Sequence, residues 1–118
     1  MRIGIARVAL AAGLLGSATG ITLGMELAEP GDAAIQINNY VYRPKVITVK
    51  VGTTVTWTNH DYVPHTVIST TQLFRSPVFF ANDNFTFTFA TPGTYEYYCT
   101  IHPKMTGTVV VEAAATTP

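Results

Sequence analysis

The stretch Phe85-Thr86-Phe87-Thr88-Phe89 decides the fold class of this chain. Aromatic residues and threonines alternate in it without interruption. Successive side chains of a β-strand point to opposite faces of a sheet, so the stretch predicts a strand with an aromatic face and a threonine face. The aromatic face is expected to cover a hydrophobic core.

Similar runs of β-branched and aromatic residues lie on both sides of this strand, separated by turns rich in Gly, Pro and Asn. These runs are residues 34–37, 46–50, 53–59, 65–69, 95–99 and 107–112. No segment after residue 33 shows a helical period, and residues 70–83 are expected to form a loop or a single helical turn. Six to eight short strands of this kind predict one all-β domain, either an antiparallel sandwich or a small barrel.

The length and the charge of the chain limit its function. A chain of 118 residues is large enough for one hydrophobic core and one domain. Only 12% of its residues are charged, and the formal net charge is zero. Nucleic acid is therefore not expected as a partner, because binding to phosphates requires a clustered excess of Lys and Arg.

Residues 1–28 have the pattern of a secretory signal peptide: two arginines, an apolar stretch and then small residues up to Gly20. The alternative is a retained N-terminal anchor, because the apolar stretch up to Met25 has about the minimum length that spans a bilayer. Both interpretations place the folded part in the periplasm or elsewhere outside the cytoplasm, and it is soluble unless the anchor is retained. Residues 29–33 are then a linker, 34–112 the folded domain and 113–118 a tail.

The segment Cys99-Thr100-Ile101-His102-Pro103-Lys104-Met105 carries the chemistry of the chain. It places a thiolate, an imidazole and a thioether at three-residue intervals directly after a predicted strand. Cys99 is the only cysteine, so it has no disulfide partner within the chain although the expected compartment is oxidising. A soft metal that accepts sulfur and nitrogen ligands accounts for all three residues, and copper fits this set.

His65, at the start of another predicted strand, offers a second imidazole. Together with Cys99 and His102 it would form a trigonal set, with Met105 as a weak axial ligand, which is the arrangement of blue-copper electron-transfer sites. A structural zinc site would favour more thiolates over a thioether. A nucleophilic cysteine is not supported, because no third group orients the imidazole. His60 is expected to be a solvated loop histidine.

Residues 95–107 resemble the copper loop of the cupredoxins, and residues 52–67 resemble the region that leads to their first histidine ligand. The C-x-x-H-x-x-M spacing is similar to the short loop of amicyanin-like members, within the amicyanin- and plastocyanin-like part of the family. The resemblance implies an antiparallel Greek-key β-sandwich of six to eight strands over residues 34–112. It also implies one type 1 copper ion with the ligands His65, Cys99, His102 and Met105.

By this resemblance the chain is expected to be a monomeric one-electron carrier that alternates between Cu(II) and Cu(I), and not an enzyme. Redox partner proteins would dock near His102, where a mostly apolar patch is formed by Pro64, Ile101, Pro103 and Lys104. The alternative is a protein that buffers or delivers copper outside the cytoplasm. The small number of methionines, three in the whole chain, disfavours that alternative.

One position departs from the family pattern. Many cupredoxins have an asparagine directly after the first histidine ligand, where it bridges the two ligand loops, whereas this chain has Thr66. We expect a hydrogen bond between Thr66 and Thr100 to replace that bridge.

Overall fold

The structure of the protein is a computed structural model that describes residues 31–114. The predicted signal or anchor segment, the start of the linker and the end of the tail lie outside the described residues. Within residues 31–114 the chain forms strands, turns and loops, and no helix there is long and apolar enough to cross a membrane.

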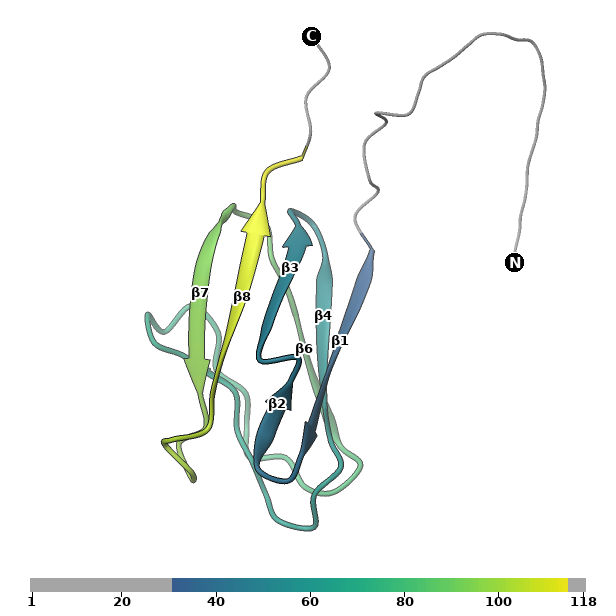
Figure 1. Ribbon diagram of the computed structural model, residues 1–118, viewed down its shortest axis with the longest axis vertical. Coiled ribbons are helices and arrows are strands. Elements are labelled where there is room, and N and C mark those ends of the chain that lie inside the picture. Colours follow the sequence, from purple (N-terminus) through teal and green to yellow (C-terminus); the bar gives the residue numbers. More distant parts are fainter. Residues whose placement is uncertain (1–30, 115–118) are drawn as a thin grey trace, which may run out of the picture. The chain divides into compact units, whose positions relative to one another are not determined.

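The described residues form eight strands in two four-stranded sheets (Figure 1). The first sheet has the order β2-β1-β4-β6, with the bounds Val41–Arg43, Asp32–Asn38, Thr54–Asn59 and Asn84–Thr88. The second sheet has the order β3-β8-β7-β5, with the bounds Val46–Lys50, Thr106–Glu112, Gly93–Tyr98 and Ile68–Ser69. The prediction of a β-sandwich with six to eight strands is confirmed.

The pairing within the sheets is mixed. Four pairs are antiparallel, as predicted: β1 with β2, β4 with β6, β5 with β7, and β7 with β8. The pairs β1 with β4 and β3 with β8 are parallel. A parallel pair needs a crossover, and the chain provides the first one by entering the second sheet with β3 before it returns as β4.

Alternating side chains of β4 and β6 show how the core is filled. In β4, Val55 and Trp57 are fully buried, and Trp57 lies opposite Phe85 in the ladder with β6. Phe85 and Phe87 are partly buried against the core, whereas Thr86 and Thr88 are exposed. The alternation of residues 85–89 therefore does place its aromatic face inward.

Three connections meet at one end of the sandwich, the lower end in Figure 1. They are the β1–β2 turn, the loop from β4 to β5, and the loop from β7 to β8. Hydrogen bonds join the β1–β2 turn to Asp61 and join Thr66 to Thr100, so the three connections form one continuous region. The predicted metal-binding residues all lie in two of these connections.

Candidate metal centre

Three of the predicted ligands converge where these loops meet. The ligand atoms of His65, Cys99 and His102 all lie within 4.8 Å of one another. The Sγ atom of Cys99 is 3.8 Å from Nδ1 of His65 and 3.8 Å from Nδ1 of His102. His65 and Cys99 are fully buried, and His102 is half-buried. Two nitrogens and one sulfur thus surround a common point, as a trigonal site requires.

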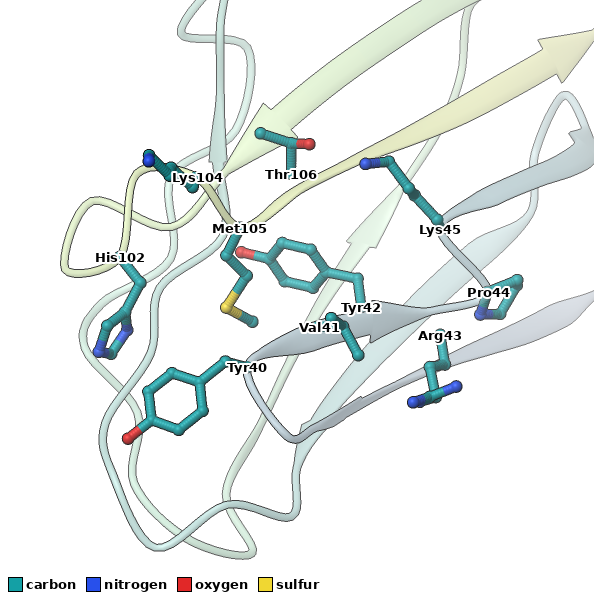
Figure 2. Close-up of a pocket in the computed structure, with 10 residues that line it drawn as sticks. All are labelled: Tyr40, Val41, Tyr42, Arg43, Pro44, Lys45, His102, Lys104, Met105 and Thr106. Atoms are coloured by element: carbon teal, nitrogen blue, oxygen red, sulfur yellow. The ribbon is translucent and has the colours of Figure 1, made fainter.

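Met105 lies in the same tight loop as Cys99 and His102. Its amide donates to the carbonyl of His102 at 2.8 Å, and its carbonyl accepts from the amide of Cys99 at 3.1 Å. Met105 is buried, and Figure 2 shows its thioether on the side of the loop where His102 and Tyr40 lie. The two backbone bonds tie Met105 directly to Cys99 and His102.

The tautomer of His65 follows from its surroundings. Its Nε2 lies 2.9 Å from Oδ2 of Asp61, and its Nδ1 faces the sulfur of Cys99. A carboxylate only accepts hydrogen bonds, so Nε2 carries the proton and Nδ1 offers a free lone pair. A carboxylate that holds a ligand histidine in this way fixes the ring and raises its basicity.

Asp61 was missed in the sequence analysis. Besides His65, its carboxylate accepts the amide of Asn39 at 2.7 Å and the amide of Tyr40 at 2.9 Å. Partial burial alone would raise the pKa of Asp61, but the hydrogen bonds from Tyr40, His65 and Asn39 outweigh it and lower that pKa. The only sequence signal was a carboxylate four residues before a candidate ligand.

Tyr40 was also missed. It and Asn39 form the two-residue turn between β1 and β2, with φ values of 63° and 58°. Two positive φ values are typical of a type I′ turn, which favours Asn and Gly rather than Tyr at its second position. The Tyr40 ring stands edge-on to both imidazoles, with centroid distances of 5.6 Å to His65 and 4.8 Å to His102. The bonds to Asp61 and these ring contacts offset the cost of this backbone conformation.

Thr66 bridges the two ligand loops. Its Oγ1 accepts the amide of Thr100 at 2.8 Å and lies 2.9 Å from Oγ1 of Thr100. The expected hydrogen bond between Thr66 and Thr100 is therefore confirmed. The amide of Thr66 also donates to the sulfur of Cys99 at 3.4 Å, so Thr66 contacts both the ligand loop and a ligand atom.

The remaining histidine does not join the cluster. His60 is exposed, and its Nε2 is in hydrogen-bond contact with Oε1 of Gln36. The prediction of a solvated loop histidine is confirmed. Tyr97 points into the core, whereas Tyr98 is half-buried. The donor set is therefore two imidazoles, one thiolate and one nearby thioether, a combination of soft and intermediate ligands that suits copper.

Comparisons with known proteins show which family the chain resembles in sequence. A family model described as a cupredoxin-like domain matches residues 6–111. Amicyanin-alpha from Methylorubrum extorquens is 34% identical over 112 residues, which cover 91% of this chain and 88% of that protein. Amicyanin from Paracoccus denitrificans is 38% identical over 92 residues, which cover 72% of this chain and 70% of that protein.

A similar solved structure is that of a novel purple cupredoxin from Nitrosopumilus maritimus. It superposes with a TM-score of 0.65 at 41% sequence identity, covering 68% of this chain and 99% of that chain. This chain and that cupredoxin are therefore similar both in their β-sandwich fold and in their sequence.

Proposed function

Because the chain belongs to the cupredoxin family, we propose that it carries single electrons through a copper ion bound by His65, Cys99, His102 and Met105. The convergence of His65, Cys99 and His102 within 4.8 Å carries the proposal. Copper supplies a Cu(II)/Cu(I) couple, and two imidazoles and a thiolate with a weak thioether suit both oxidation states. The protein must then keep the four ligand side chains in fixed positions while the copper ion changes its oxidation state.

The surroundings of the proposed ligands support this role. His65 is fully buried and is bonded to Asp61, and Cys99 is fully buried beside the amide of Thr66. The Thr66–Thr100 bridge ties the two ligand loops together. Side chains that are packed and bonded in this way change little when the charge of a bound ion changes, which favours rapid electron transfer.

His102 is the proposed route for the electron. It is half-buried, whereas His65 is enclosed. Ile101 is 41% exposed beside it, and Pro103 and Lys104 are also exposed. A partner that covers this region approaches the imidazole edge directly, and redox encounters use small interfaces of this kind.

We further propose that the chain is not an enzyme and that it acts outside the cytoplasm. The whole chain contains three histidines, so only His60 is left beside the proposed ligands, and it is bonded to Gln36. A second, catalytic copper site would need more imidazoles. The signal-like pattern of residues 1–28 supports export of the domain at residues 34–112.

The test is to add Cu(II) to the purified protein and to record visible absorption and EPR spectra. We expect an intense thiolate-to-copper charge-transfer band and a small parallel hyperfine splitting. Cys99→Ser should abolish the band, and His102→Gln should change both spectra. His60→Gln is the matched control and should change neither. A colourless protein with an ordinary cupric EPR spectrum would contradict the proposal.

Exchange with a chelator separates an electron carrier from a protein that delivers copper. A carrier retains its ion through many redox cycles, so the copper should leave slowly in both oxidation states. Loss of Cu(I) to the chelator within the mixing time would favour delivery instead.

A further inference from the structure

A hollow of about 520 Å³ lies beside two of the proposed ligands (Figure 2). It is bounded by β2 and the turn that follows it on one side, and by the β7–β8 loop on the other. We call it the basic groove and define it by five of its lining residues: Arg43, Lys45, His102, Lys104 and Met105. It adjoins the apolar patch that the sequence predicted around His102, and the two share Lys104.

The basic groove concentrates the positive charge of the described domain. Residues 31–114 contain five Lys and Arg side chains, and three of them line the groove: Arg43, Lys45 and Lys104. No Asp or Glu lines it. Within the described residues one ion pair forms, between Lys50 and Glu112, and Asp61 contacts His65; neither contact includes a side chain of the groove. In a chain with no net charge, this local excess needs an explanation.

No carboxylate within residues 31–114 forms an ion pair with the three cations of the groove. Glu96 lines a neighbouring hollow together with Lys45, so it offsets part of the charge at that lysine. Asp61, in the β4–β5 loop, bonds to the amides of the β1–β2 turn and to His65, and it forms no ion pair with a cation of the groove. Arg43 and Lys104 therefore contribute the larger part of the free positive charge.

Exposed apolar side chains adjoin the cations. Tyr40 is 46% exposed and Val41 is 40% exposed, and both line the hollow. Ile101, which is 41% exposed, directly precedes His102. A surface that combines apolar area with unpaired cations suits a protein partner better than a small anion, because a small anion would leave the apolar area uncovered.

We propose that the basic groove docks an acidic segment of the redox partner protein beside His102. The inference rests on the proposed function and adds the chemistry of the partner to it. Asp and Glu side chains of the partner would lie between Arg43 and Lys104 while its apolar atoms cover Tyr40 and Val41. The attraction weakens with salt, since the Debye length falls from about 30 Å at 0.01 M to about 8 Å at 0.15 M.

The test uses the ¹⁵N-labelled Cu(I) protein and an acetylated hexaglutamate peptide as the probe. At low ionic strength the peptide should shift the amide resonances of Arg43, Lys45 and Lys104. The double variant Arg43→Gln/Lys104→Gln should bind the peptide about fivefold more weakly than the wild type. The matched control Arg75→Gln/Lys50→Gln loses the same two charges elsewhere and should bind like the wild type. The single variant Lys104→Gln removes one charge of the groove and should also bind the peptide more weakly than the wild type.

The inference is overturned by no binding, by shifts that lie elsewhere, or by equal weakening in the double variant and its control. Inorganic phosphate that binds the same residues as tightly as the peptide would also overturn it, by showing a site for small anions. Visible spectra of each copper-loaded variant keep the two proposals separate. A blue protein without peptide binding removes only the docking inference, whereas a wild type without the charge-transfer band removes the proposed function.

Discussion

The carboxylate of Asp61 joins the enclosed histidine, His65, to the β1–β2 turn of the first sheet. Its Oδ2 lies 2.9 Å from Nε2 of His65, and the carboxylate also accepts the amides of Asn39 and Tyr40. One side chain thus orients a proposed ligand and holds the turn that places the Tyr40 ring against His102. Two parts of the site that are distant in sequence depend on the same group.

Replacing Asp61 by asparagine should weaken copper binding. The asparagine side chain has an NH₂ group in place of one carboxylate oxygen. That group cannot accept a hydrogen bond, so at least one of the three bonds from Asn39, Tyr40 and His65 is lost. Loss of such a partner of a ligand typically costs about 10- to 100-fold in metal affinity. Competition with a Cu(I) chelator measures the change. Asp83→Asn is the control, because the carboxylate of Asp83 bonds only to the amide of Phe80 within the described residues and does not contact a proposed ligand. Equal affinities of the two variants would contradict the role of Asp61.

Replacing Thr66 by alanine should destabilise the site. The change leaves the amide of Thr100 without its acceptor in a part-buried position, which costs about 1 to 3 kcal/mol. The melting temperature of the copper protein should fall, and its reduction potential should shift because the loop that holds Cys99 is released. Thr66→Ser retains the oxygen and should restore both values. An unchanged melting temperature and potential in Thr66→Ala would refute this account.

The parts of the fold that the sequence predicts are those with a long local pattern. The alternation in residues 85–89 is visible in the sequence and recurs as the half-buried face of β6. β2 was missed because it has three residues and follows an Asn39-Tyr40 turn that lacks the glycine typical of such hairpins. The run at 65–69 yields only the two-residue β5, since His65 forms an isolated bridge with Phe79 instead of extending that strand.

In the site, too, only the residues that belong to a local sequence pattern are predictable from the sequence. Cys99, His102 and Met105 lie in one short motif, so the sequence suffices to predict them as a set. Asp61 and Tyr40 are separated by 21 residues and meet only when β1, β2 and β4 form a sheet. No local pattern marks such a pair, because it depends on tertiary packing. The Thr66–Thr100 bond spans 34 residues, and it was expected only because a family pattern points to that place.

Replacing Tyr40 by alanine should lower the reduction potential of the copper site. The ring stands edge-on to both imidazoles and lines the hollow beside Met105, so its removal admits water to that side. Water stabilises the more highly charged oxidised ion more strongly, which lowers the potential. Tyr40→Phe retains the ring and should keep the wild-type potential, as measured by voltammetry. A fall in Tyr40→Phe equal to that in Tyr40→Ala would show that the hydroxyl group, and not the ring, matters.

The two buried tyrosines of the core should make the protein unstable at high pH. Burial raises the pKa of Tyr42 and of Tyr97 far above the ordinary value of 10.0. Above about pH 10 the unfolded chain therefore binds fewer protons than the folded one, and the free energy of unfolding falls by about 1.4 kcal/mol per pH unit for each tyrosine. This contribution is fully present below that pH and is lost as the pH rises toward the folded pKa values.

Tyr97→Phe should halve the slope in guanidinium denaturation of the copper protein. Near neutral pH it should change stability by less than about 1 kcal/mol, because the Tyr97 hydroxyl has no hydrogen-bond partner within the described residues. Tyr42→Phe should halve the slope too, but it should cost about 1 kcal/mol near neutral pH, because Tyr42 donates to the carbonyl of Thr66 at 2.7 Å. A slope that is unchanged in both variants would place the alkaline transition elsewhere.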